Sequence, residues 1–243
     1  NLGTPDEPTP GAIRRYLSEF LSDPRVVDLP RFIWLPILHL IILNVRPKKI
    51  VGKYQLIWGR KESPLRAIMN ALASRTEAAV INNLHSGSIV VRAAMTYGRP
   101  SISDVISEME KVGVHRYIFI PLFPQYSAAT VGASFDKVAR SLESMTNVPP
   151  SRFISGYHDK DSYIHALTKS IERYRAFRDE QTLLLFSFHG IPQAQANKGD
   201  PYPEECARTA ELVAHNLGLA PHQWRLSFQS RFGPAKWLTP YTG

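Results

Sequence analysis

A histidine stands at the end of a predicted strand. Residues 182–188 (TLLLFSF) form an apolar run, and residues 189–192 (HGIP) follow it with a glycine and a proline that favour a turn. The imidazole of His189 could act as a base near neutral pH, or bind a borderline metal ion through a neutral nitrogen. A purely structural histidine is the alternative, and position alone leaves it open.

Side chains suited to a flat, acidic ligand are spread along the chain. Aromatic residues offer flat apolar faces, and basic or hydroxyl side chains offer donors for carboxylates. The aromatic candidates are Tyr126, Phe232 and Trp237, and the donor candidates are Arg46, Lys48, Lys49, Tyr54 and Ser63. A flat acidic aromatic ligand would satisfy both sets. The alternative is that the rings lie in the core and the donors are solvated.

These residues need a framework that brings strand ends together. Strands are expected at residues 88–95, 116–122, 182–188 and 225–228, and amphipathic helices alternate with them, beginning at Thr9, Ser63 and Ser101. The alternation predicts an α/β fold with parallel sheets covered by helices on both faces. In such sheets, ligands bind beyond the carboxyl ends of the strands.

A proline pair divides the chain. The linker at residues 148–150 (VPP) separates two stretches of similar pattern, so we expect two α/β lobes, residues 1–148 and 151–243, with a cleft between them. The chain begins at Asn1 and stops at Gly243 without a helix-ending signal, and we expect truncation at both ends.

Composition excludes several classes of protein. The 243 residues are 44% hydrophobic and 21% charged, which is typical of a globular chain with a sizeable core. The single Cys206 excludes an internal disulfide and a CxxC zinc cluster or iron-sulfur centre made by this segment alone, and fits a reducing cytosol. Dinucleotide (GxGxxG), P-loop, zincin (HExxH) and nucleophile-elbow (GxSxG) motifs do not occur.

The positive charge is concentrated in one region. Residues 25–75 hold ten basic and two acidic residues, which accounts for the whole formal net charge of +8. These charges flank the apolar run 32–45 (FIWLPILHLIILNV) instead of an aromatic sheet motif, which disfavours nucleic-acid binding. The run is shorter than the roughly 20 apolar residues of a membrane span. It predicts a lip that rests on an anionic membrane or accepts an amphiphilic acid; a core helix with solvated ends is the alternative.

Six motifs together resemble the ferrochelatase family, of the type found in Gram-negative bacteria. They occur in family order along nearly the whole chain: residues 1–5 (NLGTP), 20–27 (FLSDPRVV), 121–127 (PLFPQYS), 186–192 (FSFHGIP), 198–203 (KGDPYP) and 228–233 (FQSRFG). The resemblance implies the chelatase-like fold of two Rossmann-like lobes, each a parallel sheet flanked by helices, with the second lobe incomplete here. It also implies a lyase that inserts Fe²⁺ into protoporphyrin IX to form protohaem, the last step of haem biosynthesis.

The resemblance assigns roles to the candidate residues. His189 matches the cleft histidine, as proton acceptor or transient metal ligand. Arg46, Tyr54 and, with different local spacing, Ser63 match donors to the propionates. Tyr126 matches a tyrosine beside the ring, Trp237 a tryptophan that packs near the porphyrin, and Phe232 lines the same wall. Residues of about 30–50, the lip segment, would admit the porphyrin from the membrane surface.

The resemblance also sets expectations for partners and location. Fe²⁺ is a substrate, no cofactor is required in this segment, and the protein is expected in the cytoplasm, peripheral on the inner membrane. The first strand of the family fold would precede Asn1, and the family's essential glutamate would follow Gly243. This leaves the activity of the chain by itself open.

Two other functions stay open. One is a porphyrin- or haem-binding carrier without chemistry of its own, suggested by the glutamate that lies outside this sequence. The other is a chelatase for a different metal, cobalt or nickel, or for coproporphyrin. The apolar lip segment argues against coproporphyrin, because two further carboxylates gain little from an apolar surface.

Overall fold

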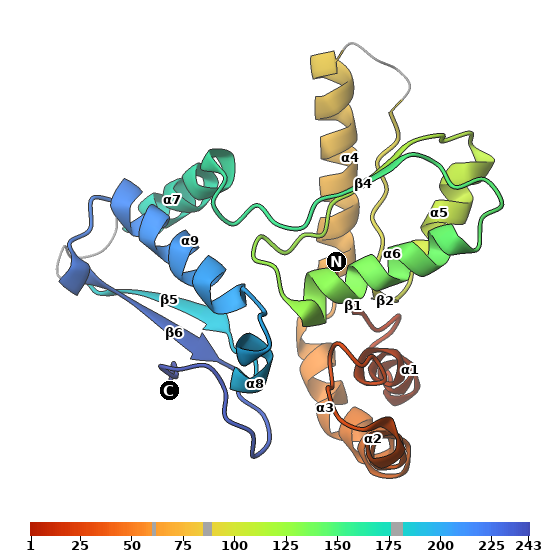
Figure 1. Cartoon of the computed structure of the whole chain (residues 1–243), viewed down its shortest axis with the longest axis horizontal. Helices are drawn as coiled ribbons and strands as arrows, with labels where there is room; N and C mark the ends of the chain where they lie inside the picture. Colours follow the sequence, from red (N-terminus) through yellow and green to blue (C-terminus); the bar gives the residue numbers. More distant parts are fainter. Residues whose placement is uncertain (60–61, 85–88, 176–181) are drawn as a thin grey trace. The chain divides into compact units, whose positions relative to one another are not determined.

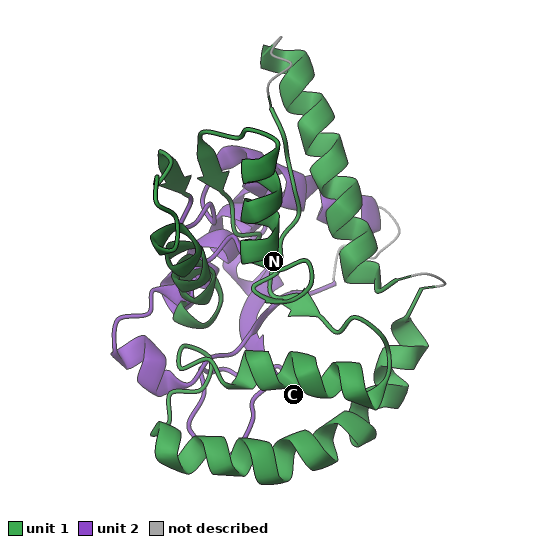
Figure 2. Ribbon diagram, turned by 90° about the vertical axis from the view of Figure 1, so that its right-hand side faces the viewer, with its two compact units in different colours: residues 1–122, 128–153 green, residues 123–127, 154–243 purple. Residues whose placement is uncertain are grey.

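The computed structural model describes residues 1–59, 62–84, 89–175 and 182–243. The chain divides into two compact units, the first made of residues 1–122 and 128–153 and the second of residues 123–127 and 154–243 (Figure 2). The lobes expected at 1–148 and 151–243 stay a prediction.

The first unit contains two short parallel sheets. Strand β1 (Gly3–Thr4) pairs with β2 (Tyr97–Gly98), and β3 (Tyr117–Phe119) pairs with β4 (Ser151–Phe153). Helix α1 (Pro10–Leu21) follows β1, and the hydroxyl of Thr9 caps it by accepting the Ala12 N–H at 3.3 Å. The side chains of Ile13, Tyr16 and Leu17 on α1 are buried and form the centre of the first core.

Besides the helices of the lip segment, several further helices belong to this unit. They are α4 (Pro64–Leu84), α5 (Ile102–Lys111), a π-helical turn (Ala128–Gly132) and α6 (Ala133–Glu143). A reciprocal capping box between Ser101 and Asp104 fixes the start of α5. Helix α5 packs against α6, and α4 contacts β1.

The lip segment forms an irregular helical path. Helix α2 (Arg31–Ile37), a π-helical stretch (Leu38–Ile42) and α3 (Leu43–Ile57) follow one another without a break, with Pro36 and Pro47 inside. Pro47 has no N–H to offer the carbonyl of Leu43, which instead accepts a hydrogen bond from the Arg14 guanidinium at 2.7 Å. In the widened turn, the Asn44 amide donates to the Leu40 carbonyl at 2.8 Å. Side chains thus satisfy the backbone where the helix is interrupted.

The second unit is built on one parallel pair of strands. Strand β5 (Leu184–His189) pairs with β6 (Trp224–Gln229) along its whole length. Helix α9 (Tyr202–Asn216) contacts β6 and packs beside α7 (Asp161–Arg175), while α8 (Gln193–Asn197) and a short 3₁₀ turn (Pro221–Gln223) complete the unit (Figure 1). The second core consists of Ile191, Cys206, Phe228 and Leu238.

The predicted class is confirmed, and one predicted strand is wrong. The described residues form a mixed α/β structure in which every sheet is parallel. The strand expected at 88–95 is absent from residues 89–94, and residue 88 lies outside the described residues. The N–H of Val91 donates to the Glu77 carboxylate at 2.7 Å, so a side chain takes the hydrogen bond that a neighbouring strand would take. None of the described helices combines the length and apolar character needed to cross a membrane.

Candidate functional site

His189 is the last residue of β5. It pairs with Gln229 at the end of β6, so its side chain lies at the carboxyl edge of the sheet, where ligands of parallel sheets bind. Partial burial lowers the pKa of the imidazole below its ordinary value of 6.5. The ring is therefore neutral at physiological pH, and one nitrogen keeps a lone pair that can take a proton or a metal ion.

The turn after His189 leaves little room for a side chain at Gly190. The N–H of Gly190 donates to the Gln229 carbonyl at 2.8 Å. A Cβ at Gly190 would lie 3.1 Å from that carbonyl oxygen and 3.4 Å from Cε3 of Trp237. The missing side chain lets Trp237 approach the backbone directly beside the histidine.

The same turn holds the aromatic candidates. Residues 191–193 run antiparallel to residues 236–238, with the Gln193 N–H donating to the Lys236 carbonyl at 2.8 Å. The indole N–H of Trp237 donates to the Phe232 carbonyl at 2.8 Å, which closes the loop after β6. The ring of Phe232 stays exposed. The structure therefore brings Trp237 and the backbone of Phe232 together at the loop that follows His189.

A partly buried tyrosine, Tyr202, and a buried cysteine, Cys206, support the histidine backbone. The Tyr202 side chain is hydrogen-bonded to the backbone of His189 and to Cys206. Burial raises the pKa of the Cys206 thiol to about 12 and also raises that of Tyr202. Both groups stay protonated at neutral pH, which makes Cys206 a packing residue. Within the described ranges, no three His, Cys, Asp or Glu side chains form a group that could hold a metal ion.

Tyr126 is positioned by its backbone. Its N–H donates to Oε2 of Glu205 at 2.6 Å, in the first turn of α9. The same carboxylate oxygen lies 3.2 Å from Nδ1 of His158, and both side chains are largely buried. One carboxylate therefore fixes the segment that carries Tyr126 to α9.

Two further contacts hold this segment against the rest of the second unit. The Ser127 hydroxyl donates to the buried Asp200 carboxylate at 3.1 Å, and the Tyr202 N–H donates to the other oxygen of Asp200. The Gln125 amide donates to the Thr209 hydroxyl at 2.9 Å. Residues 121–127 and 198–203, recognised separately in the sequence, are thus in contact. Asp200 and Glu205, which hold the segment that carries Tyr126, were not predicted as functional residues. Their position at the start of a helix was the available signal.

The residues predicted to bind propionates lie in the first unit. Arg46 and Tyr54 are both on α3; burial raises the pKa of the Tyr54 phenol, and the nearby Arg46 charge partly opposes this rise. Ser63 is buried, and its hydroxyl oxygen accepts the Arg66 N–H at 3.2 Å at the start of α4. The structure brings Arg46 and Tyr54 together, while Ser63 caps a helix.

The lip segment has two faces. Leu38 and Leu43 are buried in the first core. The exposed apolar side chains are Phe32, Ile33, Ile37, Leu40, Ile41 and Val45, with Phe32 and Leu40 exposed by 79% and 73%. Not every basic side chain of residues 25–75 is available to a ligand, because Arg25 forms a two-point ion pair with Asp136 at 2.6 and 2.9 Å.

The chain is similar to known proteins over its whole length. The family model described as Ferrochelatase matches residues 1–243. The chain is 46% identical over 242 residues to the Ferrochelatase of Psychrobacter cryohalolentis, covering 100% of this chain and 71% of that protein. It is 46% identical over 241 residues to Ferrochelatase 1 of Shewanella oneidensis (99% and 72% covered). It is also 46% identical over 242 residues to the Coproporphyrin III ferrochelatase of Streptococcus mutans (100% and 74% covered).

Proposed function

The chain belongs to the ferrochelatase family of metal-chelating lyases in haem biosynthesis, whose substrates are a porphyrin and a metal ion, and from this premise we propose that it inserts Fe²⁺ into protoporphyrin IX. The product is protohaem. Each inserted Fe²⁺ displaces two pyrrole protons, so the reaction needs a proton acceptor beside the ring. Fe²⁺ enters as a substrate, and the proposal requires no resident cofactor in this segment.

One observation carries the proposal: a neutral imidazole at the carboxyl end of a strand. The lowered pKa of His189 keeps it ready to accept a pyrrole proton at neutral pH. The same lone pair could instead hold Fe²⁺ on its way to the ring. The hydrogen bonds around Gly190 and Trp237 hold this residue's loop in place, which favours a fixed position for the base.

The other candidate residues would bind the macrocycle. Tyr126, Phe232 and Trp237 would pack against its flat faces, since aromatic rings favour offset stacking. Arg46 and Tyr54 would bind the propionates, with Ser63 as a weaker candidate because its hydroxyl oxygen already caps α4.

Two porphyrins are candidates for the substrate of this chain. The exposed apolar side chains of the lip segment favour protoporphyrin IX, which carries two carboxylates fewer than coproporphyrin. The same segment, with its basic neighbours, would place the protein in the cytoplasm, peripheral on the inner membrane. Coproporphyrin is the second candidate, because the relative named for coproporphyrin III is as similar as those named simply ferrochelatase.

An anaerobic assay tests the proposal. The chain is mixed with Fe²⁺ and either porphyrin, and loss of the porphyrin absorption bands is followed. We expect the larger kcat/KM with protoporphyrin IX. A larger value with coproporphyrin would establish the second candidate, and binding of both porphyrins without metal insertion would contradict the catalytic proposal for this chain.

A further inference from the structure

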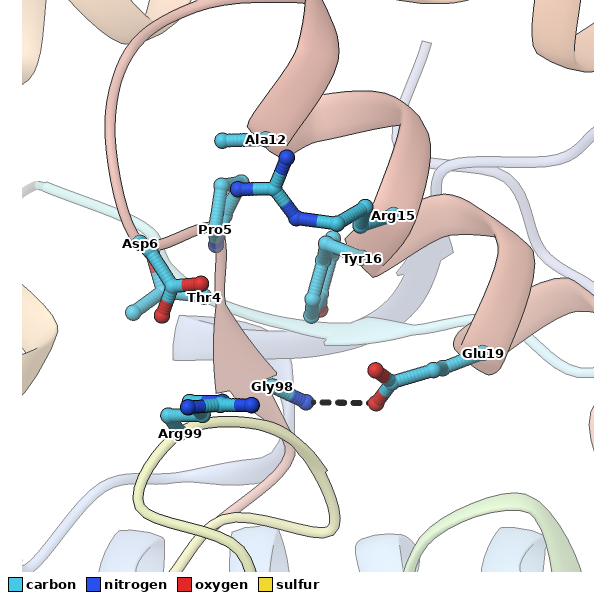
Figure 3. A pocket seen from close by; sticks show the side chains of 9 residues that line it. All are labelled: Thr4, Pro5, Asp6, Ala12, Arg15, Tyr16, Glu19, Gly98 and Arg99. Carbon is cyan, nitrogen blue, oxygen red and sulfur yellow. Dashed lines mark hydrogen bonds between the residues drawn. The ribbon is translucent and has the colours of Figure 1, made fainter.

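A pocket of about 330 Å³ lies in the first unit, between α1 and the ends of β1 and β2. Its lining includes Thr4 from β1, Arg15, Tyr16 and Glu19 from α1, and Gly98 and Arg99 from β2 and the residue after it (Figure 3). None of them is among the predicted porphyrin or metal residues. A volume near 300 Å³ is at the lower end for sites that hold small organic ligands.

The backbone of this pocket requires a glycine at position 98. Its φ of +80° lies in the left-handed region, and a Cβ there would lie 2.7 Å from the Thr4 carbonyl oxygen and 3.7 Å from the Tyr16 ring. Any other residue would push β1 and β2 apart and project into this space. The backbone of the two strands therefore forms one wall, and the Tyr16 ring, Pro5 and Ala12 form apolar parts of the lining.

The acidic side chains of the pocket already have partners. Asp6 forms an ion pair with Arg66 at 3.1 Å, and Arg66 itself lies outside the lining. Glu19 accepts the Gly98 N–H at 2.9 Å, the dashed contact in Figure 3. Neither carboxylate neutralises a guanidinium of the lining.

The two arginines of the lining have no such partner. Within residues 1–59, 62–84, 89–175 and 182–243, the side chains of Arg15 and Arg99 make no hydrogen bond or ion pair. Figure 3 shows the Arg15 guanidinium above the pocket and that of Arg99 below it. Guanidinium forks match carboxylates in a two-point geometry. The pocket thus presents two unused carboxylate-binding groups on opposite sides of a partly apolar space.

We propose that this pocket binds a small organic dicarboxylate, with one carboxylate on Arg15, the other on Arg99 and the carbon chain against Tyr16. The proposal is independent of the porphyrin reaction, since it uses none of the residues assigned to it. Inorganic phosphate offers one anionic centre and has no carbon chain to place against Tyr16, so we expect it to bind more weakly.

Calorimetric titration of the whole chain with succinate tests the proposal. We expect saturable binding of succinate, weaker binding of inorganic phosphate and none of the uncharged diamide of succinate. Arg15→Gln and Arg99→Gln should each weaken succinate binding by about ten- to a hundredfold, the loss of one charged hydrogen-bonding group. Arg140→Gln is the matched control, because it removes an exposed arginine of the same unit outside the pocket and should bind like the parent chain.

Three results would overturn the proposal: no saturable succinate binding, equal affinity in the parent chain and both pocket variants, or tighter binding of phosphate than of succinate. Thermal unfolding of each variant is recorded in parallel. Both pocket arginines are exposed, so the variants are expected to stay folded, and a loss of binding then reports on the pocket itself.

Discussion

The two units hold their candidate residues in different ways. In the first unit, Arg46 and Tyr54 lie on α3, a helix with Pro47 inside it, next to apolar side chains that face solvent. In the second unit, the loops around His189 and Tyr126 are held by buried carboxylates and backbone hydrogen bonds. The contrast matches two tasks: an apolar surface suits capture of a poorly soluble ligand, whereas proton transfer needs a group held in place.

The energetics of the two regions differ accordingly. Exposed apolar side chains contribute little to folding, so they can be kept for a ligand or a membrane. Breaking a buried hydrogen bond lowers the free energy of unfolding by about 1–3 kcal/mol, because a buried donor or acceptor is left without a partner. Substitutions in the second unit should therefore affect stability or chemistry, and those in the lip segment should affect binding.

The largest expected effect is on chemistry. His189→Ala should lower kcat for metal insertion by roughly 10²- to 10⁴-fold, the usual contribution of a positioned base, while porphyrin binding is retained. Stopped-flow absorption measures turnover, and fluorescence quenching measures binding. Near-normal turnover in this variant would contradict the catalytic role of His189.

The pH profile provides the matching control. Burial lowers the pKa of His189 below 6.5, so the folded chain keeps the neutral base at mildly acidic pH and loses it only when the pH falls through the lowered pKa. The acid limb of log kcat/KM should therefore have its midpoint below 6.5 and be absent from the residual activity of His189→Ala. A midpoint above 6.5 would contradict the role given to burial.

The next effect concerns binding in the first unit. Arg46→Leu should weaken porphyrin binding by about 1.5–3 kcal/mol, the scale of a charged hydrogen bond, and raise KM more than it lowers kcat. Lys53→Leu removes one charge from the exposed face of the same helix and serves as the control. If the two variants have equal KM values, Arg46 acts only through general charge.

A smaller effect is expected on stability in the second unit. Glu205→Ala leaves the Tyr126 N–H and His158 without their acceptor and should lower the free energy of unfolding by about 1–3 kcal/mol. Glu205→Gln keeps an acceptor oxygen and should recover part of the loss. Glu211→Ala on the same helix removes an exposed carboxylate that pairs with Arg208, and should change stability by less than about 0.5 kcal/mol. Urea denaturation measures all three; equal values for Glu205→Ala and Glu211→Ala would contradict the anchoring role.

Several local features of the two units could be predicted from the sequence. The caps at Thr9 and Ser101, the parallel α/β class and the strand end at His189 all follow from short-range patterns. The strand predicted at 88–95 failed for a long-range reason, because Glu77, 14 positions before Val91, takes its N–H. Local propensity carries no information about such a competitor.

The anchoring network was also beyond a local pattern. Tyr126 and Glu205 are 79 positions apart, and only the folded chain brings the segment 123–127 to α9.

The burial of the lip segment could not be predicted from its sequence for a different reason. Its apolar residues surround the helix on all sides, so periodicity could not separate the buried Leu38 from the exposed Leu40.

Leu40→Ala has the smallest predicted effect, and comparison with Leu38→Ala separates the two faces of the lip segment. Leu40→Ala should change the free energy of unfolding by less than about 0.5 kcal/mol, because the side chain is already in water. Leu38→Ala, which empties a buried site two positions away, should lower the free energy of unfolding by about 2–5 kcal/mol.

If the exposed face contacts a membrane, Leu40→Ala should also reduce sedimentation of the protein with lipid vesicles. Binding of the parent chain should then persist in about 1 M salt, where charges are screened within about 3 Å. Binding that disappears in salt and is unaffected by Leu40→Ala would assign membrane contact to the basic residues instead, and the apolar face would be left for the porphyrin alone.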